Sequence, residues 1–526
     1  MVIKNSNIYN IRMEAYMSKV AKAAVGLMVA TMLAKVLGFA KEQVLSYVYG
    51  ASMYTDIYIT AMNIPVVIFS SIGTALLTTF IPLYCDINNE HGEERSLKFT
   101  NNVFSLVIVL CLILAILGII YTKPLVKLFA IGFTGEKLEI AVNFTRILIM
   151  GIVSIGLTNI MSAYLQVKNN FIVPGLITLP QNIVIIVSMM LSIKLGPYAM
   201  VWGTLIGMIS QFLFQLPFAY KEGYKYKLNL DFKDEYIKKM IILVGPVFIG
   251  VAVNQVNSMI DRTLASTLAE GSISALNYAN KLNGFVLSMF IVSIASVVYP
   301  MFSKISIKDE RDEFNATIVS SINSVILLVI PISVGAIVLS RPIVEILFLR
   351  GAFDATAASM TSSALSMYSI GMIGFGLLEI LGKVFYSLQD TKTPMKNGIF
   401  TMCLNIILNF VLVKIMGHAG LALATSISTI IGGILLLNLL KFKIGNFGQH
   451  KIFLTTLKVL FSSFIMGYIV NIVYKYMLRL VAITLINKII IVGISILIGA
   501  LIYGILVYIL KIDEIYTIIN LIKRKK

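Results

Sequence analysis

The stretch "AKVLGFAKEQ" at residues 34–43 lies inside an apolar run that extends from about residue 20 to about residue 48. Lys35, Lys41 and Glu42 are the ionisable side chains of this stretch. An α-helix of about 20 mostly apolar residues crosses the roughly 30 Å hydrocarbon core of a bilayer. The run therefore predicts a membrane-spanning helix that carries three ionisable groups into or close to the lipid.

The rest of the chain has the same character. Its 526 residues are 58% hydrophobic and 13% charged, with a mean hydropathy of +0.90, whereas soluble domains are about 45–50% apolar and about 25% charged. Apolar runs recur along the whole chain, and we expect about fourteen helical spans. The expected spans are 18–47, 54–85, 100–122, 138–166, 171–194, 198–219, 238–264, 272–302, 314–340, 358–387, 394–415, 419–440, 452–474 and 485–511. The sequence thus predicts an all-α polytopic membrane protein.

Two smaller features agree with this class. The first apolar run is much longer than the roughly 7–15 residues of a signal-peptide core, so we expect it to remain as an anchor. The three cysteines, Cys85, Cys111 and Cys403, fall in or beside expected spans and form no metal or disulfide pattern. We expect inert thiols.

The net charge of +18 follows the expected topology. Lysines and arginines precede the first span, occur between spans six and seven, ten and eleven, and twelve and thirteen, and end the chain as "KRKK". They include Lys4, Arg12, Lys19, Lys221, Lys225, Lys227, Lys238, Lys239, Lys392, Lys396, Lys441, Lys443 and Lys451. With an even number of spans they share one side, which the positive-inside rule makes cytoplasmic. We therefore expect both termini in the cytoplasm and no nucleic-acid partner, although the loop "DINNEHGEERSLK" (86–98) is net acidic.

The chain also contains a weak internal repeat. "LQVKNNFIVPGLITLPQNI" (165–183) matches "LQDTKTPMKNGIFTMCLNI" (388–406) at an offset of about 223 residues, and Pro82 matches Pro300 at about 218. Such an offset places six spans in each half, an arrangement known from transporters with parallel repeats. We predict two pseudo-symmetric six-helix lobes, residues 1–225 and 226–445, followed by two extra C-terminal helices and a basic tail in 446–526. The polar segment 220–237 is the expected joint between the lobes.

Ionisable groups at bilayer depth are costly and mark functional sites when they face a protein interior. The candidates are Lys35, Lys41, Glu42, Asp56, Arg146, Asp261, Arg262, Lys281, Glu379, Lys383 and Lys414. At a rise of about 1.5 Å per residue, Lys41 lies roughly 9 Å below the outer end of its span and Lys35 about 9 Å deeper. Asn63 and Lys281 lie roughly 13 Å from the outer ends of theirs. These groups share one layer and predict a cavity that holds an anion, with lysines as phosphate-binding point charges.

Structural roles compete with this interpretation. Lys41 and Glu42 can reach the interface by snorkelling, and Asp56 can cap its helix. Arg262 with Asp261 can form an interfacial pair. Glu379 and Lys383 are four residues apart on one helical face and can neutralise each other.

Soluble-enzyme chemistry has little support. His91, His418 and His450 are isolated, and the chain has neither a phosphate-binding Gly-Lys-Ser/Thr loop nor an HExxH motif. We expect no catalytic or metal site and no cofactor. A membrane glycan polymerase would need an outer carboxylate, for which only Glu345 and Asp354 are available. The segment 340–357 that holds them predicts an amphipathic surface helix.

Several motifs together resemble one family. "AKVLGFAKEQVLSYVYGASMYTDIYITAMNIP" (34–65), "NSMIDRTLASTLAEGSISALNYANKLNGF" (257–285), "FLRGAFD" (348–354) and "VFYSLQDTKTPMKN" (384–397) are similar to the MurJ (MviN) family of lipid II flippases. This family is part of the multidrug/oligosaccharidyl-lipid/polysaccharide exporter superfamily, and the similarity runs from about residue 20 to 440.

The resemblance implies two lobes around a central cavity that opens alternately to the two membrane faces, with a lipid-tail groove formed by the last two helices. The family's cationic cavity residues, usually arginines, correspond to Lys35, Lys41 and Lys281, and its acidic ones to Glu42 and Asp56. One departure stands out. The family typically has an arginine pair and a glutamate after the span-two proline, but Pro65 is followed here by the uncharged "VVIFSSIGTALL".

The function so implied is transport of lipid II, the undecaprenyl-diphosphate-linked peptidoglycan precursor, from the inner to the outer leaflet of the bacterial cytoplasmic membrane for cell-wall biosynthesis. We expect energy from ion coupling or the membrane potential, and membrane lipids and the cell-wall synthesis machinery as further partners. The alternatives are export of another lipid-linked oligosaccharide and cation-coupled drug export.

Overall fold

The computed structural model describes residues 31–308, 311–482 and 484–514. The first part of the first expected span, the basic residues Lys4, Arg12 and Lys19, and the "KRKK" end lie outside the described residues. Predictions that concern them therefore stay predictions.

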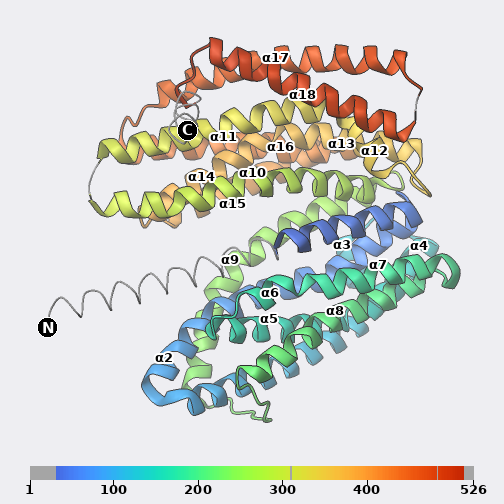
Figure 1. Ribbon diagram of the computed structural model, residues 1–526. Coiled ribbons are helices and arrows are strands. Elements are labelled where there is room, and N and C mark those ends of the chain that lie inside the picture. Colours follow the sequence, from blue (N-terminus) through green and yellow to red (C-terminus); the bar gives the residue numbers. More distant parts are fainter. Residues whose placement is uncertain (1–30, 309–310, 483, 515–526) are drawn as a thin grey trace. The chain divides into compact units, whose positions relative to one another are not determined.

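All regular structure in the described residues is helical, as the sequence predicted (Figure 1). Residues 31–49 form the first described helix. The helices that follow are α2 (Met53–Ile120), α3 (Thr122–Phe129), α4 (Gly135–Leu148), α5 (Gly151–Val167), α6 (Ile172–Leu176), α7 (Thr178–Leu195), α8 (Pro197–Lys221), α9 (Glu235–Ala265), α10 (Ser272–Lys308), α11 (Arg311–Val338), α12 (Ser340–Phe348), α13 (Ala355–Ile370), α14 (Met372–Ser387), α15 (Lys392–Met416), α16 (His418–Ile444), α17 (Gln449–Leu480) and α18 (Leu485–Ile509).

The helices follow the described part of the expected spans, but expected spans four, five and ten are each divided between two helices, α4 and α5, α6 and α7, and α13 and α14. The expected connection at 86–98 is present but almost wholly helical, because the break between the two expected spans that α2 holds is confined to Gly92. Gly92 itself has φ 80° and ψ 179°, a backbone conformation that suits glycine and breaks the helix. Within the described residues, ten helices are long and apolar enough to cross a membrane, or eleven if α13 and α14, bent by 42°, form one span. The expected number of fourteen is not confirmed.

The described chain divides into two compact units. Unit 1 contains the helix that ends at Tyr49 and Met53–Thr263, and unit 2 contains Gly50–Ser52 and the residues from Leu264 onward. In unit 1, α5 packs against α2 and α8, and α7 packs against α8. In unit 2, α16 packs against α13, α14 and α15, while α17 packs against α11 and α18. The predicted lobe boundaries at 225 and 445 stay predictions.

The structure corrects the register of the internal repeat. Helix α5 ends at Val167 and α14 at Ser387, an offset of about 220 residues. Two residues beyond each end, Asn169 (φ 62°) and Gln389 (φ 57°) both adopt the left-handed conformation. The next residue of each unit, Asn170 or Asp390, accepts a backbone hydrogen bond from the residue three positions on. The sequence match at 223 residues is therefore three residues out of register with the turn, because it rested on a few chance identities.

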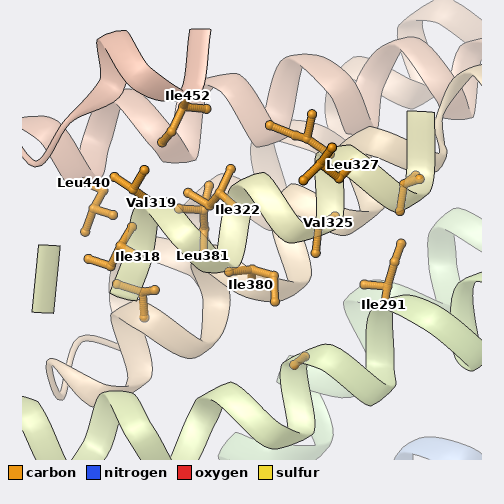
Figure 2. Packing of buried hydrophobic residues seen from close by; sticks show 14 of the residues in the cluster. Ile291, Ile318, Val319, Ile322, Val325, Leu327, Ile380, Leu381, Leu440 and Ile452 are labelled. Carbon is orange, nitrogen blue, oxygen red and sulfur yellow. The ribbon is translucent and has the colours of Figure 1, made fainter. Parts of the chain in front are cut away.

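A large apolar core in unit 2 centres on α11. Figure 2 shows Ile318, Val319 and Ile322 of α11 packed among side chains of α14, α16 and α17. The spacing of these residues places them on one face of the helix. Outer faces remain apolar too, since Leu497 and Leu501 of α18 are 65% and 67% exposed. Exposed apolar faces around an apolar core are what a lipid solvent permits.

Candidate functional site

The helix at residues 31–49 carries the charges of the opening motif and packs against α7. The Tyr49 hydroxyl donates to Ser192 Oγ at 2.8 Å. Gly38 faces Asn182, and a Cβ added to this glycine would lie 3.7 Å from the amide nitrogen. These two contacts are three helical turns apart and place the same face of the helix against α7 along its length.

Lys41 and Glu42 form a buried ion pair. Lys41 Nζ lies 3.3 Å from Glu42 Oε1, and the two side chains are only 12% and 6% exposed. The phenol of Tyr58 on α2 is close enough to interact electrostatically with Lys41. The Tyr58 hydroxyl shares a 2.9 Å hydrogen bond with Thr204 of α8. Three helices of unit 1 thus meet at one polar cluster.

Asp56 also lies in unit 1 and is buried with a basic partner. It occupies the first turn of α2, where an acidic side chain complements the helix dipole. Its Oδ2 lies 3.4 Å from Nζ of Lys137, which also lies over the Phe133 ring with its nitrogen 4.5 Å from the centroid. Sequence reasoning missed Lys137. The available signal was a basic side chain in the first turn of a helix that begins on the same side as α2. Both α4 and α2 begin at the outer side in the predicted topology.

The remaining predicted site residues have different surroundings. Lys35 and Lys281 are exposed, and Arg262 is half-buried in the last turn of α9. Asn63 is half-buried and its amide donates to the Ile59 carbonyl at 2.6 Å, a bond within its own helix. None of these placements tests a role in binding, so the site assignment stays a prediction.

The expected pair on α14 is present. Lys383 Nζ lies 3.4 Å from Glu379 Oε1, and their side chains are 31% and 39% exposed. Lys383 also lies over the Tyr299 ring of α10, 5.7 Å from its centroid. The pair therefore links two helices of unit 2.

The predicted acidic site residues of unit 1 are paired with lysines, and this pairing limits how an anion can bind there. Each acid of the predicted set has a lysine beside it, Lys41 for Glu42 and Lys137 for Asp56. An anion that approaches Lys41 in this conformation must share its ammonium group with Glu42. The side chains of Lys35 and Lys281 are exposed, so an incoming phosphate can reach them without first entering a buried ion pair.

An apolar pocket of about 370 Å³ lies in unit 2 between α10, α11, α12, α17 and α18. Leu327 and Pro331 of α11, Met466 of α17, and Ile496 and Gly499 of α18 are among its lining residues. Figure 1 shows α17 beside both α11 and α18, in agreement with its packing against these two helices. A hydrocarbon chain suits this lining, because almost no polar group is available to it.

The polar segment after α8 is held to unit 1 by side chains of α2. Asn102 donates to the Asp231 carbonyl at 2.8 Å and accepts from the Asp231 amide at 2.9 Å. Arg95 pairs with Asp234 at 2.9 Å. Burial disfavours the charged Asp234 carboxylate, but this hydrogen bond from Arg95 and backbone amides outweigh it and lower the pKa of Asp234. The predicted joint is therefore anchored along most of its length.

A further polar cluster within unit 2 was missed by sequence reasoning. The Asn409 amide donates to Asn405 Oδ1 at 3.1 Å within α15, and Asn405 donates to Thr425 of α16 at 3.4 Å. Both asparagines are at most 2% exposed. Their spacing of four residues in an apolar helix was the available signal.

The two outer carboxylates that a polymerase would need serve structural roles. Asp354 caps α13 by accepting from the Ala357 amide at 2.7 Å. Glu345 pairs with Lys488 at 2.8 Å and with Arg341 at 3.0 Å. Burial disfavours the charged form of Glu345, but these hydrogen bonds outweigh it and lower the pKa of this carboxyl. A carboxylate held ionised in this way is a poor general acid.

In the part of the chain that the structure describes, no group of three or more His, Cys, Asp or Glu side chains could hold a metal ion. The expectation that the protein has no metal site stays a prediction. The three cysteines are free thiols.

The segment at 340–357 does begin with a short helix, α12, as predicted.

Comparison with known proteins identifies the family. The family model described as "Lipid II flippase MurJ" matches residues 45–499. The chain belongs to the MurJ family. It is a family of transporters rather than of enzymes.

Individual relatives support this assignment. The chain is 30% identical over 423 residues to the probable lipid II flippase MurJ of Buchnera aphidicola subsp. Schizaphis graminum, covering 79% of this chain and 82% of the relative. It is 29% identical over 417 residues to the lipid II flippase MurJ of Burkholderia cenocepacia, covering 77% and 81%.

Solved structures agree. A lipid II flippase MurJ in an inward closed conformation matches with a TM-score of 0.78 at 29% identity, covering 92% of this chain and 98% of that one. An inward-facing multidrug transporter of the MATE family matches with a TM-score of 0.68 at 12% identity, covering 81% and 99%. The second match shows a shared fold only.

Proposed function

We propose that this protein is a lipid II flippase that moves the undecaprenyl-diphosphate-linked peptidoglycan precursor from the inner to the outer leaflet by alternating access. The family match over residues 45–499 carries this proposal. The protein then acts in the bacterial cytoplasmic membrane, with both termini in the cytoplasm, and supplies precursor for cell-wall biosynthesis.

The substrate has two chemically distinct parts that need different surroundings. The diphosphate head is an anion for Lys35, Lys41 and Lys281, with Glu42, Asp56 and Asn63 orienting the lysines and the sugar. The polyprenyl tail is a hydrocarbon for the apolar pocket of about 370 Å³ beside α17 and α18. Because lysine gives no bidentate fork to phosphate, several lysines are needed to hold one diphosphate.

Lys41 has a special position among the three cations. Its ammonium is paired with Glu42 at 3.3 Å, so release of Glu42 on substrate arrival transfers the lysine to the phosphate. Charge movement of this kind couples transport to membrane potential, since one charge moved across 100 mV is worth about 2.3 kcal/mol. The membrane potential or a coupled ion then resets the empty transporter.

Complementation tests the head-group assignment. Lys41→Ala and Lys281→Ala are each expected to abolish growth of a strain depleted of its own flippase, while the exposed Lys396→Ala on the N-terminal turn of α15 supports growth. All three must reach the membrane in equal amounts. Normal growth of both site variants would overturn the cavity assignment and leave the family intact.

The substrate itself is tested by locating lipid II. Depletion of this protein is expected to trap lipid II in the inner leaflet. If lipid II crosses normally while another polyprenyl-linked glycan accumulates, the protein exports that glycan instead. The uncharged "VVIFSSIGTALL" after Pro65 makes this comparison informative, because it removes charge that the resemblance leads one to expect in span two.

A further inference from the structure

A second pocket lies in unit 2, apart from the residues assigned to substrate. It has a volume of about 380 Å³ and is formed at the start of α11, the start of α17 and the end of α18. Its lining includes Ser320 and Asn323 of α11, Lys451 and Thr455 of α17, and Asp513 and Glu514 after α18. In the predicted topology these helix ends lie at the cytoplasmic face.

The chain turn after α18 brings the two acids to this pocket. Lys511 adopts the left-handed conformation with φ 50°, and its amide donates to the Tyr508 carbonyl while the Ile512 amide donates to Val507. This pattern is a Schellman motif. Val507 and Ile512 are 0% and 2% exposed in the apolar core, which fixes the direction in which Asp513 and Glu514 leave the helix.

Two polar atoms at the pocket are buried without a hydrogen-bond partner. The Asn323 amide donates to Glu514 Oε1 at 2.5 Å, but Asn323 Oδ1 and Glu514 Oε2 have no partner. Asn323 is only 2% exposed. A buried acceptor without a hydrogen bond costs free energy, and the cost is larger for a charged group. A ligand that donates hydrogen bonds to these two atoms would therefore bind favourably in the pocket.

The missing donor must carry several hydrogens and a positive charge. A primary ammonium offers three N–H donors, enough for Asn323 Oδ1, Glu514 Oε2 and a third acceptor. Lys451 stands at the same pocket and suits a neighbouring phosphate. An ammonium next to a phosphate is the headgroup of an aminophospholipid such as phosphatidylethanolamine.

The surroundings of the pocket suit a lipid. On α17, Phe453, Leu454 and Leu457 flank Thr455 and are 60%, 42% and 48% exposed. In a spanning helix such side chains face hydrocarbon. An acyl chain has an apolar surface to follow directly beside the polar pocket.

We propose that this pocket binds the headgroup of phosphatidylethanolamine from the inner leaflet, with the ammonium on Asn323 and Glu514 and the phosphate on Lys451. The bound lipid joins the ends of α11, α17 and α18, and it is distinct from the transported substrate. The proposal does not depend on which glycan the protein moves.

The experiment places the full chain in nanodiscs that contain phosphatidylglycerol with either phosphatidylethanolamine or phosphatidylcholine, and counts retained lipids by native mass spectrometry. Phosphatidylcholine is the matched ligand control, because its quaternary ammonium has no N–H donor. Wild type is expected to retain phosphatidylethanolamine about tenfold better, as the loss of charge-assisted hydrogen bonds implies.

Two variants and one control locate the site. Glu514→Gln, which keeps the shape of the side chain, and Asn323→Leu are each expected to remove most of this preference. Asp312→Asn, at an exposed acid in the first turn of α11, is expected to keep it. If Asn323→Leu does not fold, Glu514→Gln still decides the outcome.

Three results would overturn the proposal. The first is equal retention of the two lipids by wild type, which is the result expected if water fills the pocket. The second is an equal loss of preference in Asp312→Asn and Glu514→Gln. The third is thermal stabilisation of the delipidated protein by free ethanolamine or spermidine to the same extent as by phosphatidylethanolamine, which would identify a soluble amine as the ligand.

Discussion

The anchoring of the polar segment after α8 gives a quantitative prediction. Asn102 is 0% exposed and makes two hydrogen bonds with the backbone of Asp231, at 2.8 and 2.9 Å. Asn102→Leu keeps the branched heavy-atom skeleton of the side chain and removes both hydrogen bonds. At about 1 kcal/mol of net stabilisation per hydrogen bond, local opening of the segment becomes easier by about 2 kcal/mol, or roughly thirtyfold.

Asn101→Leu is the matched control. Its side-chain amide makes one bond to this segment, with the Lys225 carbonyl at 3.1 Å, so the expected change is about 1 kcal/mol, or roughly fivefold. Hydrogen–deuterium exchange of the peptide that covers 224–234 measures both values in the purified full chain. Exchange of α8 is expected to stay unchanged.

The order of the two effects decides the outcome. If Asn102→Leu and Asn101→Leu accelerate exchange equally, or if neither does, the bidentate contact does not hold the segment. The predicted joint between the lobes would then be free. Faster exchange in Asn102→Leu alone would mean that the single hydrogen bond from Asn101 adds little to holding the segment.

Three further predictions concern stability and are checked by thermal unfolding. Lys137→Met leaves the buried Asp56 carboxylate without its ammonium and is expected to cost about 3 kcal/mol; adding Asp56→Asn should recover most of the loss, and a double variant no better than Lys137→Met would contradict the pairing. Hydrogen bonds from Lys443 and the Thr393 backbone lower the pKa of Asp390 from 3.8 to about 2. Because this pKa is depressed, wild type should have a higher melting temperature than Asp390→Asn at neutral pH, and this difference should shrink as the pH falls from about 4 toward 2. A difference that stays constant with pH would show that the ionised Asp390 carboxylate is not what stabilises the protein. Gly374→Ala on α14 places a Cβ 2.5 Å from the backbone of α16 and should lower the free energy of unfolding by about 1–3 kcal/mol. An unchanged melting temperature would show that α14 and α16 can move apart at this contact at little cost.

Much of the architecture could be predicted because a lipid solvent leaves few options. Long apolar runs must be helical to satisfy their backbone groups, and the described residues contain only helices as regular structure. Breaks inside those runs were harder to foresee. The 42° bend between α13 and α14 lies at Gly371, where an added Cβ would lie 2.6 Å from Ser426, and this requirement comes from packing rather than from composition.

The repeat illustrates the same limit. Sequence identity aligned Leu165 with Leu388, but the equivalent left-handed turns are at Asn169 and Gln389. In apolar helices many residues are interchangeable, so identity is a weak guide to register. Backbone conformation at a turn admits few alternatives and is the better marker.

By itself the sequence determined that the chain is helical and spans a membrane, and its motifs identified the MurJ family, whereas the division into two related six-helix lobes stays a prediction. Only the tertiary structure decided the partners of the buried charges. Lys137 reaches Asp56 from a helix 81 residues away, and Glu514 reaches Asn323 across 191 residues. Hydropathy is a local property that each segment carries alone, whereas the neutralisation of a buried charge depends on which distant segment the fold brings beside it.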